Sequence, residues 1–243
     1  GRASSKSYAE SAFAMIDTLY IEQAIATHHR VREIGSRFPN ANQIMCERYG
    51  AVFNRKSQNF RLQKKNPSLI LAHKFDNHVL ATPEGYGIGG RNNYYFSHML
   101  NCIYDCRYCF LQGMYRSAHY VLFVNYEEFF SAMDAKLMAH DGEDVWFFSG
   151  YDCDSLALNP LTGFAEHLLS YLETRPQAMV ELRTKSTQIR ALLGQAPLSN
   201  VIVAFSLTPE PAAVALEHKT PSVAKRINAM TQLAQNGWRL GLR

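Results

Sequence analysis

The second half of the chain alternates strictly between stretches that predict strands and stretches that predict helices. Apolar runs typical of buried strands lie at residues 144–150, 178–185, 200–208 and 238–243. Helical stretches precede and separate them at residues 126–140, 163–175, 187–194 and 222–237. Strict alternation of this kind is typical of right-handed βαβ units that build a parallel sheet. With the aromatic run 94–100 counted as the first strand, the sequence predicts five parallel strands.

The N-terminal part predicts a smaller α/β unit of its own. Strands are expected at residues 18–21, 43–49 and 68–74, with a helix from Glu22 to about Arg37. We therefore expect an α/β protein with an N-terminal α/β unit over residues 1–85 and a second unit over residues 86–243. The chain stops inside the last expected strand. We accordingly expect a fragment of a longer protein, or closing elements that lie elsewhere.

A turn-rich stretch at residues 82–93, TPEGYGIGGRNN, separates these two units. It contains the pattern G-x-G-x-x-G at Gly85, Gly87 and Gly90. That pattern marks a dinucleotide site only where a helix follows it, and here an aromatic, strand-like run follows. The stretch is therefore interpreted as a connector.

Composition limits the class of protein. Hydrophobic residues make up 47% of the 243 residues, which is enough for a full core. No apolar run approaches the length of a membrane-spanning helix, and the N-terminus does not resemble a signal peptide. The net charge of +4 permits nucleic-acid binding without demonstrating it. Five cysteines, an odd number, favour reduced thiols and a cytoplasmic protein with no membrane association.

Three of the five cysteines lie within eight positions, as Cys102, Cys106 and Cys109. Their spacing is C-x3-C-x2-C, between an expected strand and an expected helix. Three thiolates leave one corner of a four-iron cluster open for another ligand. A structural zinc ion would instead need a fourth protein ligand, for which Cys153, His98 and His119 are candidates. A third interpretation is that these are ordinary core cysteines.

The cysteine motif, with Tyr108 before its last cysteine, resembles the signature of the radical S-adenosylmethionine superfamily. More narrowly, CRYCFLQ at residues 106–112 resembles the spore photoproduct lyases, and RTKSTQIRALL and AFSLTPE follow in the expected order. The resemblance implies a partial (β/α)6-type barrel, incomplete at its C-terminus, with a 4Fe-4S cluster and S-adenosylmethionine as cofactors. It implies a carbon–carbon lyase that repairs a thymine-dimer lesion in DNA through a 5′-deoxyadenosyl radical. An electron donor such as flavodoxin or ferredoxin is the implied partner.

The resemblance also assigns roles to individual residues. The cluster ligands would be Cys102, Cys106 and Cys109. The S-adenosylmethionine site would include Ser149, Gly150, Lys185 and Ser206, all at the ends of expected strands.

Hydrogen transfer would involve Cys153, Tyr108 and Tyr151. The family's hydrogen-donor cysteine aligns near Tyr151, so Cys153 is displaced by two positions. The family's second tyrosine is Phe110 here. Both departures concern the quenching of the radical and not its generation.

Two alternative functions remain open at this point. One is a radical enzyme of the same superfamily with another substrate. The other is a zinc-stabilised nucleic-acid-binding module without catalysis. The basic segment 55–65 suits distorted nucleic acid, because it interleaves five positive charges with Phe60, or it forms a solvated surface.

Overall fold

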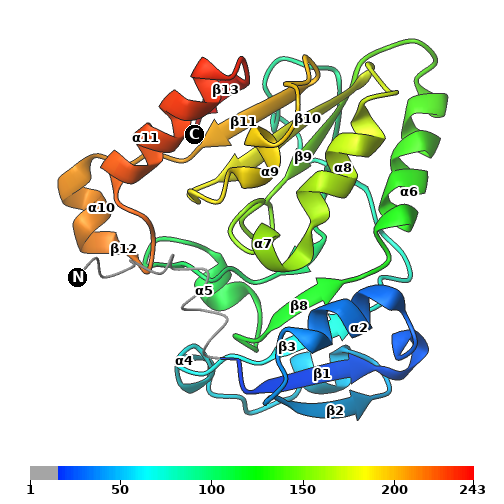
Figure 1. Cartoon of the computed structure of the whole chain (residues 1–243), viewed down its shortest axis with the longest axis vertical. Coiled ribbons are helices and arrows are strands. Elements are labelled where there is room, and N and C mark those ends of the chain that lie inside the picture. The colour runs from blue at the N-terminus through cyan, green and yellow to red at the C-terminus, as the bar shows by residue number, and fades with distance from the viewer. Residues whose placement is uncertain (1–15) are drawn as a thin grey trace. The chain divides into compact units, whose positions relative to one another are not determined.

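The computed structural model describes residues 16–243, which divide into two compact units (Figure 1). The first unit comprises the described residues up to His73, together with Met99–Val124 and Leu216–Thr220. The second unit comprises Lys74–His98, Asn125–Ala215 and Pro221–Arg243. Each unit is built on its own sheet.

The second unit contains a six-stranded sheet in the order β13-β11-β10-β9-β5-β4. Five of these strands are parallel and follow one another in sequence order, whereas β4 runs antiparallel to β5 at the edge. The strands are β4 Leu80–Ala81, β5 Asn92–Phe96, β9 Val145–Ser149, β10 Ala178–Thr184, β11 Val201–Phe205 and β13 Arg239–Leu242. The predicted set of five parallel strands, and with it the partial barrel, is confirmed.

Helices connect these strands as the alternation predicts. They are α6 Tyr126–Ala139, α7 Asn159–Thr162, α8 Phe164–Leu172, α9 Arg190–Leu193, α10 Glu210–Leu216 and α11 Val223–Gln235. Ser222 caps α11 by accepting a hydrogen bond from the Lys225 amide, and Gly237 follows the helix with a φ of 85°. Within the described residues, no helix is long and apolar enough to cross a bilayer. The short helices α7 and α10 were not predicted, because neither carries a full period of apolar residues.

The first unit is built on a five-stranded sheet in the order β2-β1-β3-β8-β6. Its strands are β1 Thr18–Glu22, β2 Asn42–Cys46, β3 Leu69–Ala72, β6 Met99–Leu100 and β8 Tyr120–Phe123. A separate pair consists of β7 Asp105–Cys106 and β12 Glu217–His218. The helices are η1 Gln23–Ile25, α2 His29–Ser36, α3 Gly50–Phe53, α4 Phe60–Gln63 and α5 Leu111–Met114.

Three sequence predictions need correction. The helix expected from Glu22 to Arg37 is split into η1 and α2, because His28 is extended and caps α2 by accepting from the Arg30 amide. The run 94–100 forms two strands, β5 and β6, in different sheets. The fully buried strand β8 was missed because YVLF is too short to show a period.

The division into residues 1–85 and 86–243 stays a prediction about domains, and the compact units are not consecutive in the sequence. β3 pairs in parallel with β8, and β8 pairs with β6, so residues after 86 complete the sheet that β1 begins. The backbone N–H and C=O groups along the free edge of β3 need hydrogen-bond partners, and β8 supplies them. Residues after position 86 therefore belong to the first unit.

His98 lies in the core of the second unit. Its ring stacks on Phe164 with centroids 4.0 Å apart and 5° between the planes. Burial lowers the pKa of His98 from 6.5 to about 3. The neutral ring is therefore the form that the folded protein accommodates.

Replacing His98 with phenylalanine should reduce the loss of stability at acid pH. The unfolded chain takes up a proton at His98 below pH 6.5, whereas the folded protein does so only near pH 3. Stability from this group is therefore complete above pH 6.5 and is lost as the pH falls. The loss amounts to about 2 kcal/mol at pH 5. Urea unfolding at pH 7 and pH 5 measures it, with His29→Phe on the exposed surface as control. An equal pH dependence in wild type and His98→Phe would contradict the assignment.

Candidate functional site

The three clustered cysteines lie on one loop of the first unit, between β6 and α5. Asn101 opens the loop with a φ of 70°, and its Nδ2 donates to the carbonyls of Ser117 and His119 at 2.7 and 2.8 Å. A tight turn follows, in which the Cys109 amide donates to the Cys106 carbonyl at 3.1 Å. None of the five cysteines, all of them within the described residues, forms a disulfide. The loop is thus a built structure that carries three thiols.

A second segment of the first unit fixes the centre of the loop. β7 pairs antiparallel with β12, with Cys106 opposite Glu217. The Arg107 amide donates to the Leu216 carbonyl at 2.8 Å, and the hydroxyl of Tyr108 donates to the buried carboxylate of Glu217. Glu217 could not be recognised from the sequence, because it lies more than a hundred residues from the tyrosine it holds.

The three cysteines share one loop, but the structure does not draw them together as a metal site. Among the described residues, no three histidine, cysteine, aspartate or glutamate side chains are grouped as ligands of one metal ion. The thiolates of a four-iron cluster bind different iron corners and so need not converge on one point. A structural zinc ion requires four ligands around one centre.

The candidates for a fourth zinc ligand have other surroundings. His98 is stacked on Phe164 in the core of the second unit. His119 accepts a hydrogen bond from the Ser68 amide through Nδ1 at 2.9 Å, and burial lowers its pKa. Cys153 is buried in the second unit. Neither histidine is therefore a suitable fourth ligand for a zinc ion held by the three cysteines.

The residues expected to bind S-adenosylmethionine all lie at one edge of the parallel sheet in the second unit. Ser149 is the last residue of β9, Lys185 directly follows β10, and Ser206 directly follows β11. The register pairs Ser149 with Leu182 and Thr184 with Phe205, so these strands end side by side. Ligands of open parallel sheets bind at this carboxyl edge. The structure therefore brings the expected residues of this unit together.

Gly150 at this edge has no room for a side chain. Its φ is 86°, and an added Cβ would lie 2.7 Å from Ser155 Oγ and 2.9 Å from the Arg183 carbonyl. Ser155 in turn donates to Ser149 Oγ at 3.0 Å. A glycine is therefore required for the loop to fold back onto the strand ends.

Asp154 organises this edge and was missed by the sequence analysis. Its Oδ1 accepts from the amides of Leu156 and Ala157 at 3.0 and 2.9 Å and from Thr184 Oγ1 at 2.7 Å. Its Oδ2 accepts from the Lys185 amide at 2.7 Å. Burial raises the pKa of Asp154, and these four hydrogen bonds oppose that shift. The carboxylate thus fastens the loop after β9 to the end of β10.

The residues expected to transfer hydrogen in this unit lie on the same loop. Cys153 is buried, with 6% of its surface exposed, so it is shielded from bulk water. Tyr151 is half-buried, and its ring lies 4.7 Å from that of Tyr95 and 6.2 Å from that of Tyr86. The loop therefore combines a shielded thiol with a cluster of phenols.

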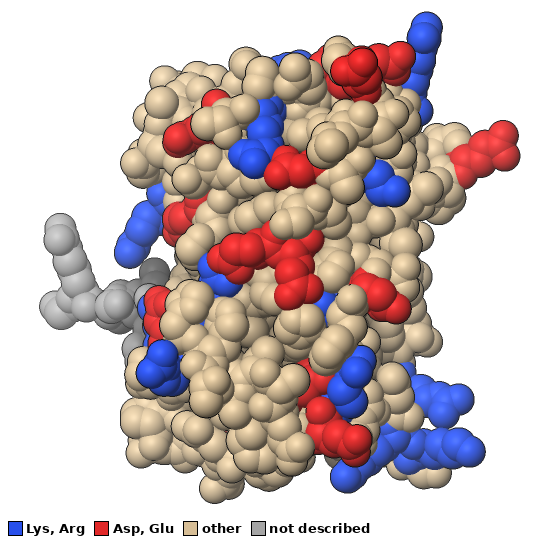
Figure 2. Space-filling model, turned by 90° about the vertical axis from the view of Figure 1, so that its right-hand side faces the viewer, with Lys and Arg blue, Asp and Glu red and all other residues tan. Residues whose placement is uncertain are grey.

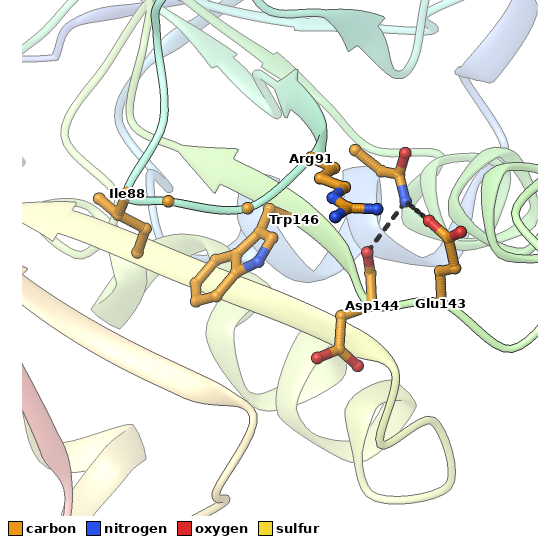
Figure 3. A pocket seen from close by; sticks show the side chains of 8 residues that line it. Ile88, Arg91, Glu143, Asp144 and Trp146 are labelled. Carbon is orange, nitrogen blue, oxygen red and sulfur yellow. Dashed lines mark hydrogen bonds between the residues drawn. The ribbon is translucent and has the colours of Figure 1, made fainter.

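A shallow hollow of about 400 Å³ in the second unit lies at the opposite edge of the sheet (Figure 3). Asn92, at the start of β5, donates to Glu143 Oε2 at 2.9 Å. An added Cβ on Gly90 would lie 2.1 Å from Trp146, so this glycine is explained by packing. The strand β5 follows the glycine-rich stretch, which agrees with a connector and not with a dinucleotide site.

The basic segment 55–65 serves partly as structure. Lys64 is buried, and Arg61 lies 3.7 Å from Asp105 in an ion pair. Both signs of charge are present across the face shown in Figure 2. Other basic residues of the segment, among them Arg55, Lys56 and Lys65, are exposed, and both interpretations of the segment stay open.

Solved structures with a similar fold are all spore photoproduct lyases. A cysteine-to-serine mutant matches with a TM-score of 0.80 at 16% identity, and a mutant with bound AdoMet and dinucleoside spore photoproduct matches with 0.81 at 16%. The enzyme complexed with dinucleoside spore photoproduct matches with 0.80 at 15%. Each match covers 93% of this chain and 66% of the other, so the chain spans just under two thirds of those proteins. A search of curated proteins found no match.

The parallel strands and helices of the second unit form a partial α/β barrel. A family model described as spore photoproduct lyase matches residues 91–243, more than half of the chain. The chain belongs to the spore photoproduct lyase family.

Replacing Asp154 with asparagine should destabilise the carboxyl edge. The new amide nitrogen cannot accept the hydrogen bond from the Lys185 amide, and a buried donor left unpaired costs about 1–3 kcal/mol. Urea unfolding measures the loss, with the exposed Asp141→Asn as matched control. A variant within about 0.5 kcal/mol of wild type would show that Asp154 does not fasten the loop.

Proposed function

We propose that this protein is a radical S-adenosylmethionine lyase that reverses a thymine-dimer lesion in DNA. The observation that carries the proposal is the loop with three thiols outside disulfides, on a chain of the spore photoproduct lyase family. Relatives of the same fold were solved with AdoMet and with dinucleoside spore photoproduct. In this proposal the reaction is the cleavage of a carbon–carbon bond between two thymines.

The proposed cofactors are a 4Fe-4S cluster and S-adenosylmethionine. Cys102, Cys106 and Cys109 would hold the cluster, which would supply the electron that splits S-adenosylmethionine into methionine and a 5′-deoxyadenosyl radical. At the strand ends, the ammonium of Lys185 suits the methionine carboxylate of S-adenosylmethionine. The hydroxyl of Ser206 suits a polar edge of the same molecule. Ser149 and Gly150, at the end of β9, would lie beside the methionine amino group.

Cys153 is proposed to return a hydrogen atom to the repaired thymine. A thiol S–H bond is weak, so the thiol can quench a carbon radical. Burial of Cys153 supports this role, because it limits competing reactions with water and oxidants. Tyr151 is proposed to restore the thiol, and Tyr108, held by Glu217, is the second candidate.

An electron donor such as flavodoxin or ferredoxin is the proposed partner, because the reaction must start with one electron. We also propose a reduced, cytoplasmic environment, in which the thiols can assemble a cluster.

Anaerobic reconstitution with iron and sulfide should give the wild-type chain broad absorption in the violet, and Cys102→Ala should lose it. The reason is that each thiolate holds a different iron corner. Wild type with S-adenosylmethionine and dithionite should then convert dinucleoside spore photoproduct to two thymidines, measured by chromatography. Cleavage of S-adenosylmethionine without repair would favour another substrate. Uptake of zinc without any cluster would overturn the proposal.

Replacing Cys153 with alanine should leave S-adenosylmethionine cleavage intact while clean repair falls by about tenfold or more. The substrate radical would still form, but it would be quenched by other donors and give side products. Product analysis by mass spectrometry measures the ratio of thymine to side products. Cys46→Ala, which removes the buried cysteine of β2, is the matched control. An unchanged ratio in Cys153→Ala would remove Cys153 from the mechanism.

A further inference from the structure

Lys64 is a buried lysine of the first unit with an unusual set of contacts. It follows α4 as its C-cap residue, and only 6% of its surface is exposed. Its Nζ donates to the carbonyl of Cys102 at 2.8 Å and to the carbonyl of Tyr104 at 3.1 Å. Both acceptors belong to the three-cysteine loop. A buried charge of this kind is costly unless the surroundings compensate it.

The backbone at Lys64 is itself held in place. The Lys64 carbonyl accepts from Lys219 Nζ at 3.3 Å, and Lys219 directly follows β12, the strand that pairs with β7 of the loop. The neighbouring Gln63 accepts from the Ala118 amide at 2.9 Å, beyond the other end of the loop. The segment that carries Lys64 is therefore held by hydrogen bonds from Lys219 and from Ala118.

The ammonium of Lys64 lies beside the backbone of Cys102, one of the proposed cluster ligands. Burial lowers the pKa of Lys64 and the neighbouring cation Lys219 adds to that shift, whereas Cys102, Asp105 and Cys109 oppose it. Two of these three groups are the proposed cluster ligands. A neutral donor could satisfy the two carbonyls, but an ammonium 2.8 Å from the carbonyl of Cys102 also brings a positive charge to the loop that carries the thiols.

We propose that Lys64 is a positioning residue for the cluster: it fastens the cysteine loop through two carbonyls and stabilises the reduced cluster with its positive charge. The second part rests on the proposed function. A four-iron cluster held by three thiolates is net negative and gains one more negative charge on reduction. A nearby cation therefore favours the reduced form, which is the form that delivers the electron.

The first test uses the protein without iron, so it does not depend on the proposed function. Hydrogen exchange should show faster exchange of the Arg107 and Cys109 amides in Lys64→Met than in wild type. These amides donate to Leu216 and Cys106 inside the ordered loop. The adjacent and exposed Lys65→Met removes the same charge without touching the loop and should exchange like wild type. Equal protection in Lys64→Met and wild type would overturn the anchoring role.

The second test measures the reduction potential of the reconstituted cluster by a redox titration followed by electron paramagnetic resonance. Lys64→Met should hold roughly tenfold less reduced cluster at a fixed potential, a shift of about 59 mV to more negative values for one electron. Lys64→Arg keeps the charge and should recover most of the loss, and Lys65→Met should match wild type. A merely structural role would lower cluster content without moving the potential.

The outcomes separate the two proposals. If wild type assembles a cluster and Lys64→Met has the same potential, the electrostatic role is wrong while the proposed function stands. If wild type assembles no cluster, the proposed function and the electrostatic role both fail, and hydrogen exchange still decides the anchoring role. Lys64→Gln, whose amide keeps one donor without the charge, replaces Lys64→Met if the methionine variant does not fold.

Discussion

Parallel pairing in one register is the constraint on which the candidate site of the second unit depends. Ser149, Thr184 and Phe205 end three neighbouring strands at the same edge, because the ladder pairs Thr184 with Phe205 and Ser149 with Leu182, two residues before the end of β10. The residues that follow, Gly150, Lys185 and Ser206, are then neighbours without being close in sequence. A slip of one residue would turn every side chain to the other face of the sheet. The apolar interior, with Phe147, Val180 and Val203 fully buried, fixes that register.

The alternation of strand-like and helical segments made most of the second unit predictable from the sequence. The five parallel strands and their connecting helices follow from apolar runs at a regular spacing, and Gly237 marks the end of α11 as expected. The first unit was less predictable, because its sheet is completed by residues distant in sequence. β8 and β6 are short; β8 pairs with β3 and β6 pairs with β8, and no local pattern encodes this tertiary pairing.

Some residues of the candidate site could be named from local sequence features, whereas others depend on contacts between residues distant in sequence. The cysteine spacing and the strand ends are local features, so residues such as Cys106 and Lys185 could be named in advance. The groups that hold these residues are Asp154, Glu217 and Lys64, and no local pattern singles them out. An acidic residue in a loop and a lysine in a basic segment resemble solvated surface groups until their burial is known. Supporting residues are therefore the part of a site that sequence reasoning misses first.

Each unit uses a buried charged side chain to hold a loop that carries candidate site residues, and the sign of the charge differs between the two units. In the second unit a carboxylate, Asp154, accepts hydrogen bonds from the amides of its own loop and from the end of β10. In the first unit an ammonium, Lys64, donates to the carbonyls of the cysteine loop. The sign of the anchoring charge also has an electrostatic consequence. A cation next to thiolates favours an electron-rich centre, whereas a carboxylate in the same place would oppose it. The loop that carries the thiols is the one held by the cation, which is the arrangement that the proposed cluster would favour.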